Sequence, residues 1–135
     1  MGAPFKFIAE AKKKNKKVFA DVKPHNKEYF IGVDLVSPNE EEAAQIAGAN
    51  GKIRDIGPHL ARYFGADVAV TQGSDGISVF RRDGSAHHIS GKKIKVFDVS
   101  GAGDTVIAVL ALGVASGLDL EAAAHLANNA GAIVV

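Results

Sequence analysis

The segment best suited to chemistry is residues 98–105, which read Asp-Val-Ser-Gly-Ala-Gly-Asp-Thr directly before a strongly apolar helical stretch. The consecutive small residues Gly101, Ala102 and Gly103 let the backbone turn sharply and direct free N–H groups outward. With the positive end of the helix dipole beside them, these amides predict an anion hole for a phosphoryl group. Asp104 is well placed to take a proton from a hydroxyl that attacks the phosphorus. From spacing alone, loop glycines followed by an acid in the first helical turn explain the segment equally well.

The same segment carries a resemblance to a known family. Residues 98–104 resemble the C-terminal signature of the ribokinase-like carbohydrate kinases (the PfkB family). With the apolar run that follows, they are most similar to its bacterial heptose 7-phosphate kinase branch. The resemblance covers about residues 18–135 and implies transfer of the γ-phosphoryl group of ATP to a sugar or sugar-phosphate hydroxyl, with Mg²⁺ as cofactor. It gives Asp104 the role of catalytic base and the preceding small residues that of the anion hole.

Two further matches concern metal ions. Asn39 and Glu42 fit the family's Asn-x-x-Glu element, whose members help to order Mg²⁺ and the phosphates, often through water. Taken alone, the pair is better explained as a capping box that satisfies helix amides, although both roles can hold at once. Asp98 and Ser100 match positions that help to hold a monovalent cation such as K⁺ in ribokinase-like members. The other ligands of that site come from a loop beyond this C-terminus, so the site is incomplete here.

Other matches concern the nucleotide. Thr71, Gly73 and Gly76 form the Thr-x-Gly-x-x-Gly turn that lies beside the nucleotide in these kinases. Alone, a strand and a glycine-bearing turn more often form a hairpin. Lys23 ends an Asp-x-Lys run similar to that of the heptose kinase branch. At the carboxyl edge of a parallel sheet, the Lys23 side chain would reach a bound phosphate. A solvated lysine explains the position equally well. Asn128 matches an asparagine near the adenine or ribose.

The elements that must position these residues alternate along the chain. Helical periodicity predicts helices at residues 4–17, 40–47, 53–64, 103–116 and 120–130, with the Gly57-Pro58 pair as the true start of the third. Apolar, β-prone runs predict strands at residues 18–22, 32–36, 67–71, 77–81 and 86–89. We expect an α/β fold: a partial ribokinase-like three-layer sandwich, with a mainly parallel sheet, an antiparallel edge hairpin and helices packed on it.

The composition excludes several classes of function. A net charge of +1 argues against a protein held to nucleic acid or a membrane by bulk charge, and the longest apolar stretch, residues 106–115, is shorter than the roughly 18 residues of a membrane span. The lack of cysteine excludes disulfides and thiolate metal sites and is compatible with the cytoplasm. His87 and His88 would point to opposite faces of a strand, so we expect exposed side chains rather than a joint metal site.

The domain assignment follows from the resemblance. We expect residues 1–135 to be the ATP-binding, base-carrying C-terminal half of a carbohydrate kinase domain, with the N-terminal sugar-binding half and the final helix absent. The expected partners are ATP, a small sugar or sugar phosphate, and the missing half or another subunit that covers an unpaired apolar sheet edge. The alternative is a non-catalytic nucleotide-binding or assembly fragment that needs another chain for activity. A dinucleotide-binding glycine pattern after the first strand and a P-loop are both missing.

Overall fold

The computed structural model describes the backbone of residues 3–91 and 100–134, and side chains within residues 7–91 and 106–129. The elements follow one another in this order: α1 (Ala3–Lys13), β1 (Phe19–Ala20), the 3-10 helix η1 (Pro24–Phe30), β2 (Leu35–Val36), α2 (Glu40–Ala47), α3 (Ile53–Phe64), β3 (Asp67–Thr71), the 3-10 turn η2 (Gly73–Asp75), β4 (Ile77–Phe80), β5 (Ala86–Ile89), α4 (Ser100–Ala115) and α5 (Leu120–Val134). No helix among the described residues is both long and apolar enough to cross a membrane.

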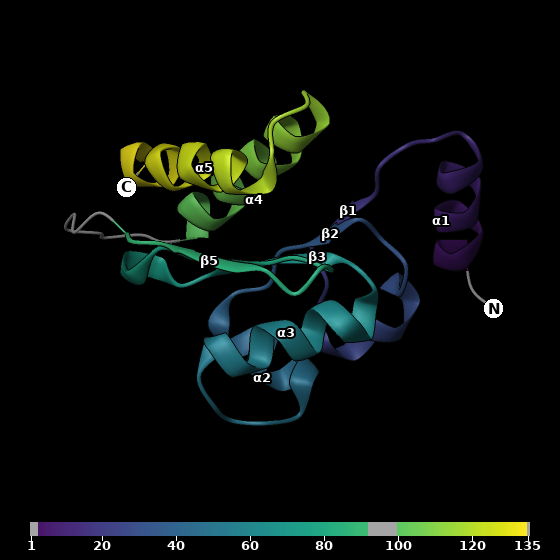
Figure 1. Ribbon diagram of the computed structural model, residues 1–135, viewed down its shortest axis with the longest axis horizontal. Helices are drawn as coiled ribbons and strands as arrows, with labels where there is room; N and C mark the ends of the chain where they lie inside the picture. The colour runs from purple at the N-terminus through teal and green to yellow at the C-terminus, as the bar shows by residue number, and fades with distance from the viewer. Residues whose placement is uncertain (1–2, 92–99, 135) are drawn as a thin grey trace.

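The strands form one sheet in the order β1-β2-β3-β4-β5. The pairs β1–β2 and β2–β3 are parallel, whereas β3–β4 and β4–β5 are antiparallel, so the central hairpin occupies one edge as predicted. Helices α4 and α5 cover one face of the sheet, and α2 and α3 cover the other (Figure 1). The predicted α/β class with three layers is therefore confirmed. Helix α1 lies beyond the β1 edge and joins the core of the α2–α3 side through its buried residue Ile8.

The middle strand β3 separates two hydrophobic cores. Its side chains alternate between the faces of the sheet, so Val68 and Val70 join the cluster that contains Phe64 of α3, whereas Ala69 joins the cluster that contains Leu110 of α4. All five side chains are fully buried. Burial on both faces explains why this strand reads as a nearly continuous apolar run.

Two ion pairs made by Arg81 connect the β4–β5 hairpin to helix α5. Asp119 caps α5, since its Oδ1 atom accepts a hydrogen bond from the Glu121 backbone N–H at 2.9 Å. The Arg81 guanidinium, just after β4, donates to the same carboxylate and lies 3.6 Å from the Glu121 carboxylate. The hydrogen bond from the Glu121 N–H has the largest effect on the pKa of Asp119, and that from Arg81 the next largest. Both lower this pKa below its ordinary value of 3.8.

The start of α3 differs from the prediction. The helix begins at Ile53 rather than at the Gly57-Pro58 pair, and Pro58 lies inside it. Pro58 cannot donate the hydrogen bond that an ordinary residue would give to the carbonyl four residues earlier. The helix persists through this position because its face is buried against the sheet: a Cβ atom at Gly57 would meet the Phe80 ring at 2.3 Å. Tertiary packing therefore overrides the local signal.

The first two strands are shorter than predicted, with two residues each instead of five. The Asp34 side chain accepts the hydrogen bond of the Val18 backbone N–H at 2.8 Å, which a longer ladder would have given to a backbone carbonyl. The Asp34 and Leu35 amides then both donate to the Val18 carbonyl, at 2.9 and 3.3 Å. An acidic side chain thus replaces the start of the ladder.

Candidate functional site

The carboxyl ends of the parallel strands bring two of the predicted motifs together. Asn39, which follows β2, forms an isolated parallel bridge with Thr71 at the end of β3. The Thr71 N–H donates to the Pro38 carbonyl at 3.0 Å. The Asn-x-x-Glu element and the Thr-x-Gly turn are therefore neighbours, although more than thirty residues separate them in the sequence. In an open α/β sheet this edge is the usual place for a ligand.

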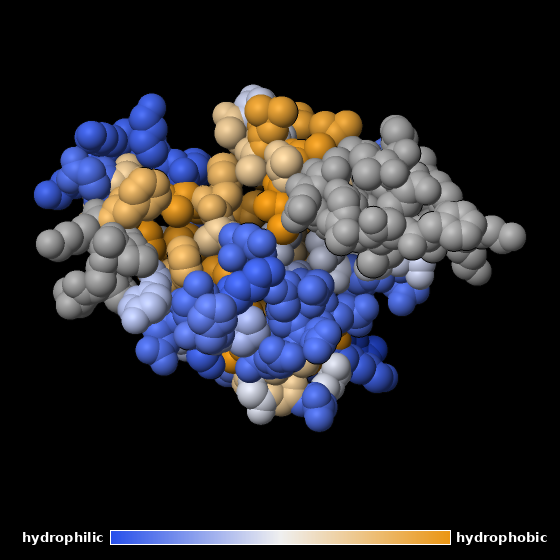
Figure 2. Space-filling model, turned by 180° about the vertical axis from the view of Figure 1, so that it is seen from behind, coloured by the Kyte–Doolittle hydropathy of each residue, from blue (hydrophilic) through white to orange (hydrophobic). Residues whose placement is uncertain are grey.

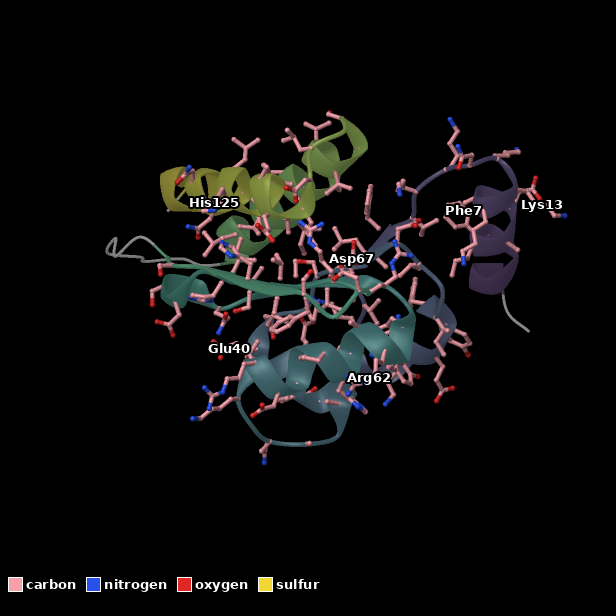
Figure 3. All side chains as sticks on the ribbon, viewed as in Figure 1. Phe7, Lys13, Glu40, Arg62, Asp67 and His125 are labelled. Carbon is pink, nitrogen blue, oxygen red and sulfur yellow. The ribbon has the colours of Figure 1, made fainter. Side chains whose placement is uncertain are left out.

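Asn39 and Glu42 form the predicted capping box. The Asn39 Oδ1 atom accepts from the Glu42 N–H at 2.8 Å, and the Glu42 Oε1 atom accepts from the Asn39 N–H at 3.0 Å. The cap fixes the start of α2. This first turn, marked by Glu40 in Figure 3, lies on the opposite side of the sheet from α5, which is marked by His125. Because only one Glu42 oxygen is used by the cap, the carboxylate keeps a second oxygen that points away from it.

That second oxygen binds Lys23. The Lys23 Nζ atom lies 2.7 Å from Glu42 Oε2 and 3.5 Å from Asp21 Oδ1. The hydrogen bond to Glu42, with the charges of the two carboxylates, raises the pKa of Lys23 above its ordinary value of 10.5, against the opposing effect of desolvation. The predicted lysine and glutamate are thus brought into direct contact by the pairing of β1 with β2.

The turn after β3 is tightly built. Gly76 has a φ of +99°, and a Cβ atom there would stand 1.9 Å from the Ile89 carbonyl oxygen, so glycine is required by both conformation and space. The turn is closed by a hydrogen bond from the Gln72 N–H to the Gly76 carbonyl at 2.8 Å. The turn continues into the antiparallel strand β4, so it has the hairpin geometry that the local sequence favours.

A side-chain network that the sequence did not suggest supports this turn. The Ser78 hydroxyl, on β4, donates to the Gln72 side-chain oxygen and lies 2.8 Å from Nδ1 of His88 on β5. Ser78 and His88 are direct cross-strand partners, which the hairpin register alone would have revealed. Both His87 and His88 are exposed, as predicted, and they contact different partners, since the His87 ring faces that of His125 at 5.9 Å.

Asn128 of α5 reaches the same edge of the sheet. Its Nδ2 atom donates to the Ser90 carbonyl, just beyond β5, at 3.0 Å. A Cβ atom at Gly76 would also come within 2.9 Å of the Ser90 carbonyl carbon, so Asn128 stands beside the turn. The structure therefore places Asn128 next to the motif with which the resemblance groups it.

Helix α4 begins earlier than predicted, at Ser100 instead of Gly103. The small residues expected in a loop, and Asp104 after them, therefore belong to the first five residues of the helix. In a helix that begins at Ser100, the N–H groups of Gly101 and Ala102 have no intrahelical acceptor, whereas that of Gly103 is the first that has one. Helices α4 and α5 form an antiparallel hairpin in which Gly113 adjoins Ala123. The Asp104 side chain and the whole of Asp98 lie outside the described residues.

The described donors suit a weakly ligated Mg²⁺ ion better than a closed metal cage. Within residues 7–91 and 106–129, no group of three or more His, Asp or Glu side chains could hold a metal ion. Mg²⁺ usually retains several waters and takes one or two carboxylates together with substrate phosphates. The Glu42 carboxylate at an open edge fits that arrangement. The buried hydroxyl of Ser37, two residues before Asn39, has no hydrogen-bond partner in the described part of the chain.

The sequence and the fold both match known proteins. A family model described as "pfkB family carbohydrate kinase" matches residues 3–135. The chain is 38% identical over 132 residues to the "Bifunctional protein HldE" of Gluconobacter oxydans and 41% identical over 134 residues to that of Caulobacter vibrioides, covering 95% of this chain each time. A ribokinase from Arabidopsis thaliana, solved with ribose and ATP, superposes with a TM-score of 0.81 over 96% of this chain at 27% identity. The ribokinase-like character of the fold is thereby confirmed.

These matches cover only part of each relative. The chain spans 28% of the length of both HldE proteins and 44% of the ribokinase chain. More than half of the ribokinase therefore has no counterpart among these residues.

Proposed function

The chain belongs to the pfkB family of carbohydrate kinases, and we propose that it carries the phosphoryl-donor and proton-acceptor side of a site that transfers the γ-phosphoryl group of ATP to a sugar or sugar-phosphate hydroxyl. The observation that carries the proposal is the meeting of separate motifs at one sheet edge. Asn39 bridges Thr71, Glu42 binds Lys23, and Asn128 reaches the strand end beside Gly76.

Each of these groups has a role in the proposed transfer. The first-turn amides at Gly101 and Ala102, with the small residue Gly103 beside them, hold the transferring phosphoryl group, and their fixed dipoles stabilise the charge that develops on its oxygens. Asp104 accepts the proton of the attacking sugar hydroxyl. Because that hydroxyl becomes nucleophilic only as its proton leaves, the carboxylate and the amides must act on neighbouring atoms. This requirement is compatible with the position of all four residues within the first five residues of α4, which begins at Ser100.

The remaining candidates bind the nucleotide and its cations. Thr71, Gly73 and Gly76 line the nucleotide, Asn128 lies near the adenine or ribose, and Lys23 binds phosphate oxygens. Mg²⁺, when bound, neutralises phosphate charge. Glu42 would hold it through water, with Asn39 fixing the carboxylate. Asp98 and Ser100 would contribute to a K⁺ or similar monovalent site. The ATP supply that this chemistry needs agrees with a cytoplasmic location.

The acceptor side of the site is proposed to come from another polypeptide segment, the N-terminal half of a pfkB domain, so that residues 1–135 act as the C-terminal half. Strand β1 is at the end of the described sheet and pairs only with β2. Beside it lies a cavity of about 430 Å³ whose lining is mostly apolar and includes Phe7, Phe19 and Phe30. Figure 2 shows apolar side chains gathered on this face of the molecule. Such an edge favours an added strand or helix.

A complementation assay tests the proposal. The chain is mixed with the N-terminal half of a pfkB sugar kinase, ATP, Mg²⁺ and a panel of sugars that includes a heptose phosphate, and phosphorylated product is measured. Asp104→Asn should lower turnover by about 10²- to 10⁴-fold while circular dichroism and ATP affinity are unchanged. Asp83→Asn, which removes the same charge from the exposed β4–β5 turn, serves as the matched control and should keep full turnover.

Two outcomes would count against the proposal. ATP binding that survives Asp104→Asn, combined with no turnover in any mixture, would favour the alternative of a non-catalytic nucleotide-binding or assembly fragment. Turnover that Asp104→Asn leaves unchanged would refute the role of Asp104 as base.

A further inference from the structure

The lysine and the carboxylate that the proposed function assigns to phosphate and metal form an ion pair with each other. Lys23 Nζ is 2.7 Å from Glu42 Oε2, while Glu42 Oε1 is held by the Asn39 N–H at 3.0 Å. Both carboxylate oxygens therefore have partners within the chain. Lys23 is likewise flanked by two carboxylates, since Asp21 lies 3.5 Å away.

We propose that the Lys23–Glu42 ion pair is the resting form of the site and that it is exchanged when the metal–nucleotide complex binds. Lys23 leaves Glu42 for a phosphate oxygen, and the freed carboxylate oxygen accepts hydrogen bonds from the water shell of the metal ion. The inference rests on the proposed function. It adds that Lys23 occupies the place of the metal ion at Glu42, and that Glu42 occupies the place of the phosphate at Lys23.

The structure indicates which member of the pair moves. The Glu42 side chain is 15% exposed and is fixed by the capping box, whereas the Lys23 side chain is 47% exposed on a flexible stem. Lys23 can therefore reorient without disturbing the core or the start of α2. Glu42 stays where it is, so the metal meets a carboxylate that is already oriented.

Charge balance then couples the two ligands. A divalent cation alone meets a carboxylate that an ammonium group already neutralises. ATP without metal meets a lysine whose charge is shared with two carboxylates. When both ligands bind, the cation replaces Lys23 at Glu42 and the phosphate replaces Glu42 at Lys23. The binding of each ligand therefore increases the affinity of the site for the other. Reciprocal coupling of this kind must appear equally in both affinities.

Binding measurements on single variants test the exchange. Mn²⁺ affinity is measured by electron paramagnetic resonance without nucleotide, and ATP affinity by calorimetry in EDTA. Lys23→Met should tighten Mn²⁺ binding and Glu42→Gln should tighten metal-free ATP binding, each by about two- to tenfold, as expected for an exposed ion pair. Glutamine can still cap α2, so Glu42→Gln removes the charge and keeps the helix start.

The controls separate the pair from general charge effects. Lys13→Met removes the same charge from the exposed end of α1, away from Glu40 and the start of α2 (Figure 3), and should leave both affinities unchanged. In the double variant Lys23→Met/Glu42→Gln both gains should disappear, because each gain depends on the remaining member of the pair.

The outcomes distinguish this inference from the proposed function. If Lys23→Met leaves Mn²⁺ affinity unchanged or weakens it, while the wild-type chain binds ATP with Mg²⁺, the exchange is refuted and the proposed function stands. If the wild-type chain binds neither ATP nor Mn²⁺, alone or together, both are refuted.

Discussion

Alanine at Gly76 is expected to destabilise the chain more than alanine at Gly84, although both glycines have nearly the same φ, +99° and +93°. The positive φ costs Gly84→Ala about 1–2 kcal/mol. Gly76 combines its positive φ with a ψ of −141°, outside the left-handed helical region, so its backbone conformation costs an alanine about 1–3 kcal/mol. At Gly84 nothing lies within 4 Å of the added Cβ, whereas at Gly76 it stands 1.9 Å from the Ile89 carbonyl oxygen, and ordinary contacts begin at 3.4 Å. The backbone of the turn and the end of β5 must therefore separate, at a cost typical of overpacking, about 1–3 kcal/mol.

The expected loss of unfolding free energy is thus about 1–2 kcal/mol for Gly84→Ala and about 2–6 kcal/mol for Gly76→Ala. Urea titration followed by circular dichroism measures both, and thermal unfolding should show a clearly larger fall in Tm for Gly76→Ala. Calorimetry with ATP adds a functional readout, since only the Gly76 turn belongs to the proposed nucleotide site. Equal losses of stability in the two variants would show that the close approach of β5 does not restrict residue 76.

Three further predictions concern stability. Asn39→Ala removes the cap of α2 and should lower the unfolding free energy by about 0.5–2 kcal/mol in urea titration, whereas Asn39→Ser should retain most of it. Phe64→Ala empties a fully buried position and should cost about 3–5 kcal/mol, with a matching drop in the urea midpoint. The pKa of Asp119 is lowered in the folded chain, so the ionised carboxylate stabilises the fold at pH values above the ordinary pKa of 3.8, and this stabilisation is lost as the pH falls through the folded pKa. In urea titrations from pH 6 to 2, the unfolding free energy of Asp119→Asn should therefore decline less steeply with falling pH than that of the wild type.

Local signals predicted the elements whose ends are set by nearby residues. The bounds of α2 follow from the Asn39 cap and from Gly48, which is its C-cap. The bounds of β3 and β5 follow from apolar runs between turn residues and match the prediction. In each case the determining interactions lie within a few positions of the element, so the sequence alone contains them.

Other features depend on contacts between distant segments. The sequence placed the start of α3 at Gly57-Pro58, because the packing of Gly57 under Phe80 of β4 is invisible until the sheet is assembled. The resemblance suggested Lys23 and Glu42 separately. Their contact across 19 residues depends on the register of β1 and β2, which brings Phe19 opposite Leu35.

The sheet is arranged in the order in which its strands are translated. Each strand from β2 onward therefore finds its partner in the segment synthesised just before it, and none has to be inserted between two strands that are already joined. Loop closure at each step spans a single crossover or hairpin, which keeps its entropic cost small. A chain of this kind can add each of its described strands to the one before it while it leaves the ribosome.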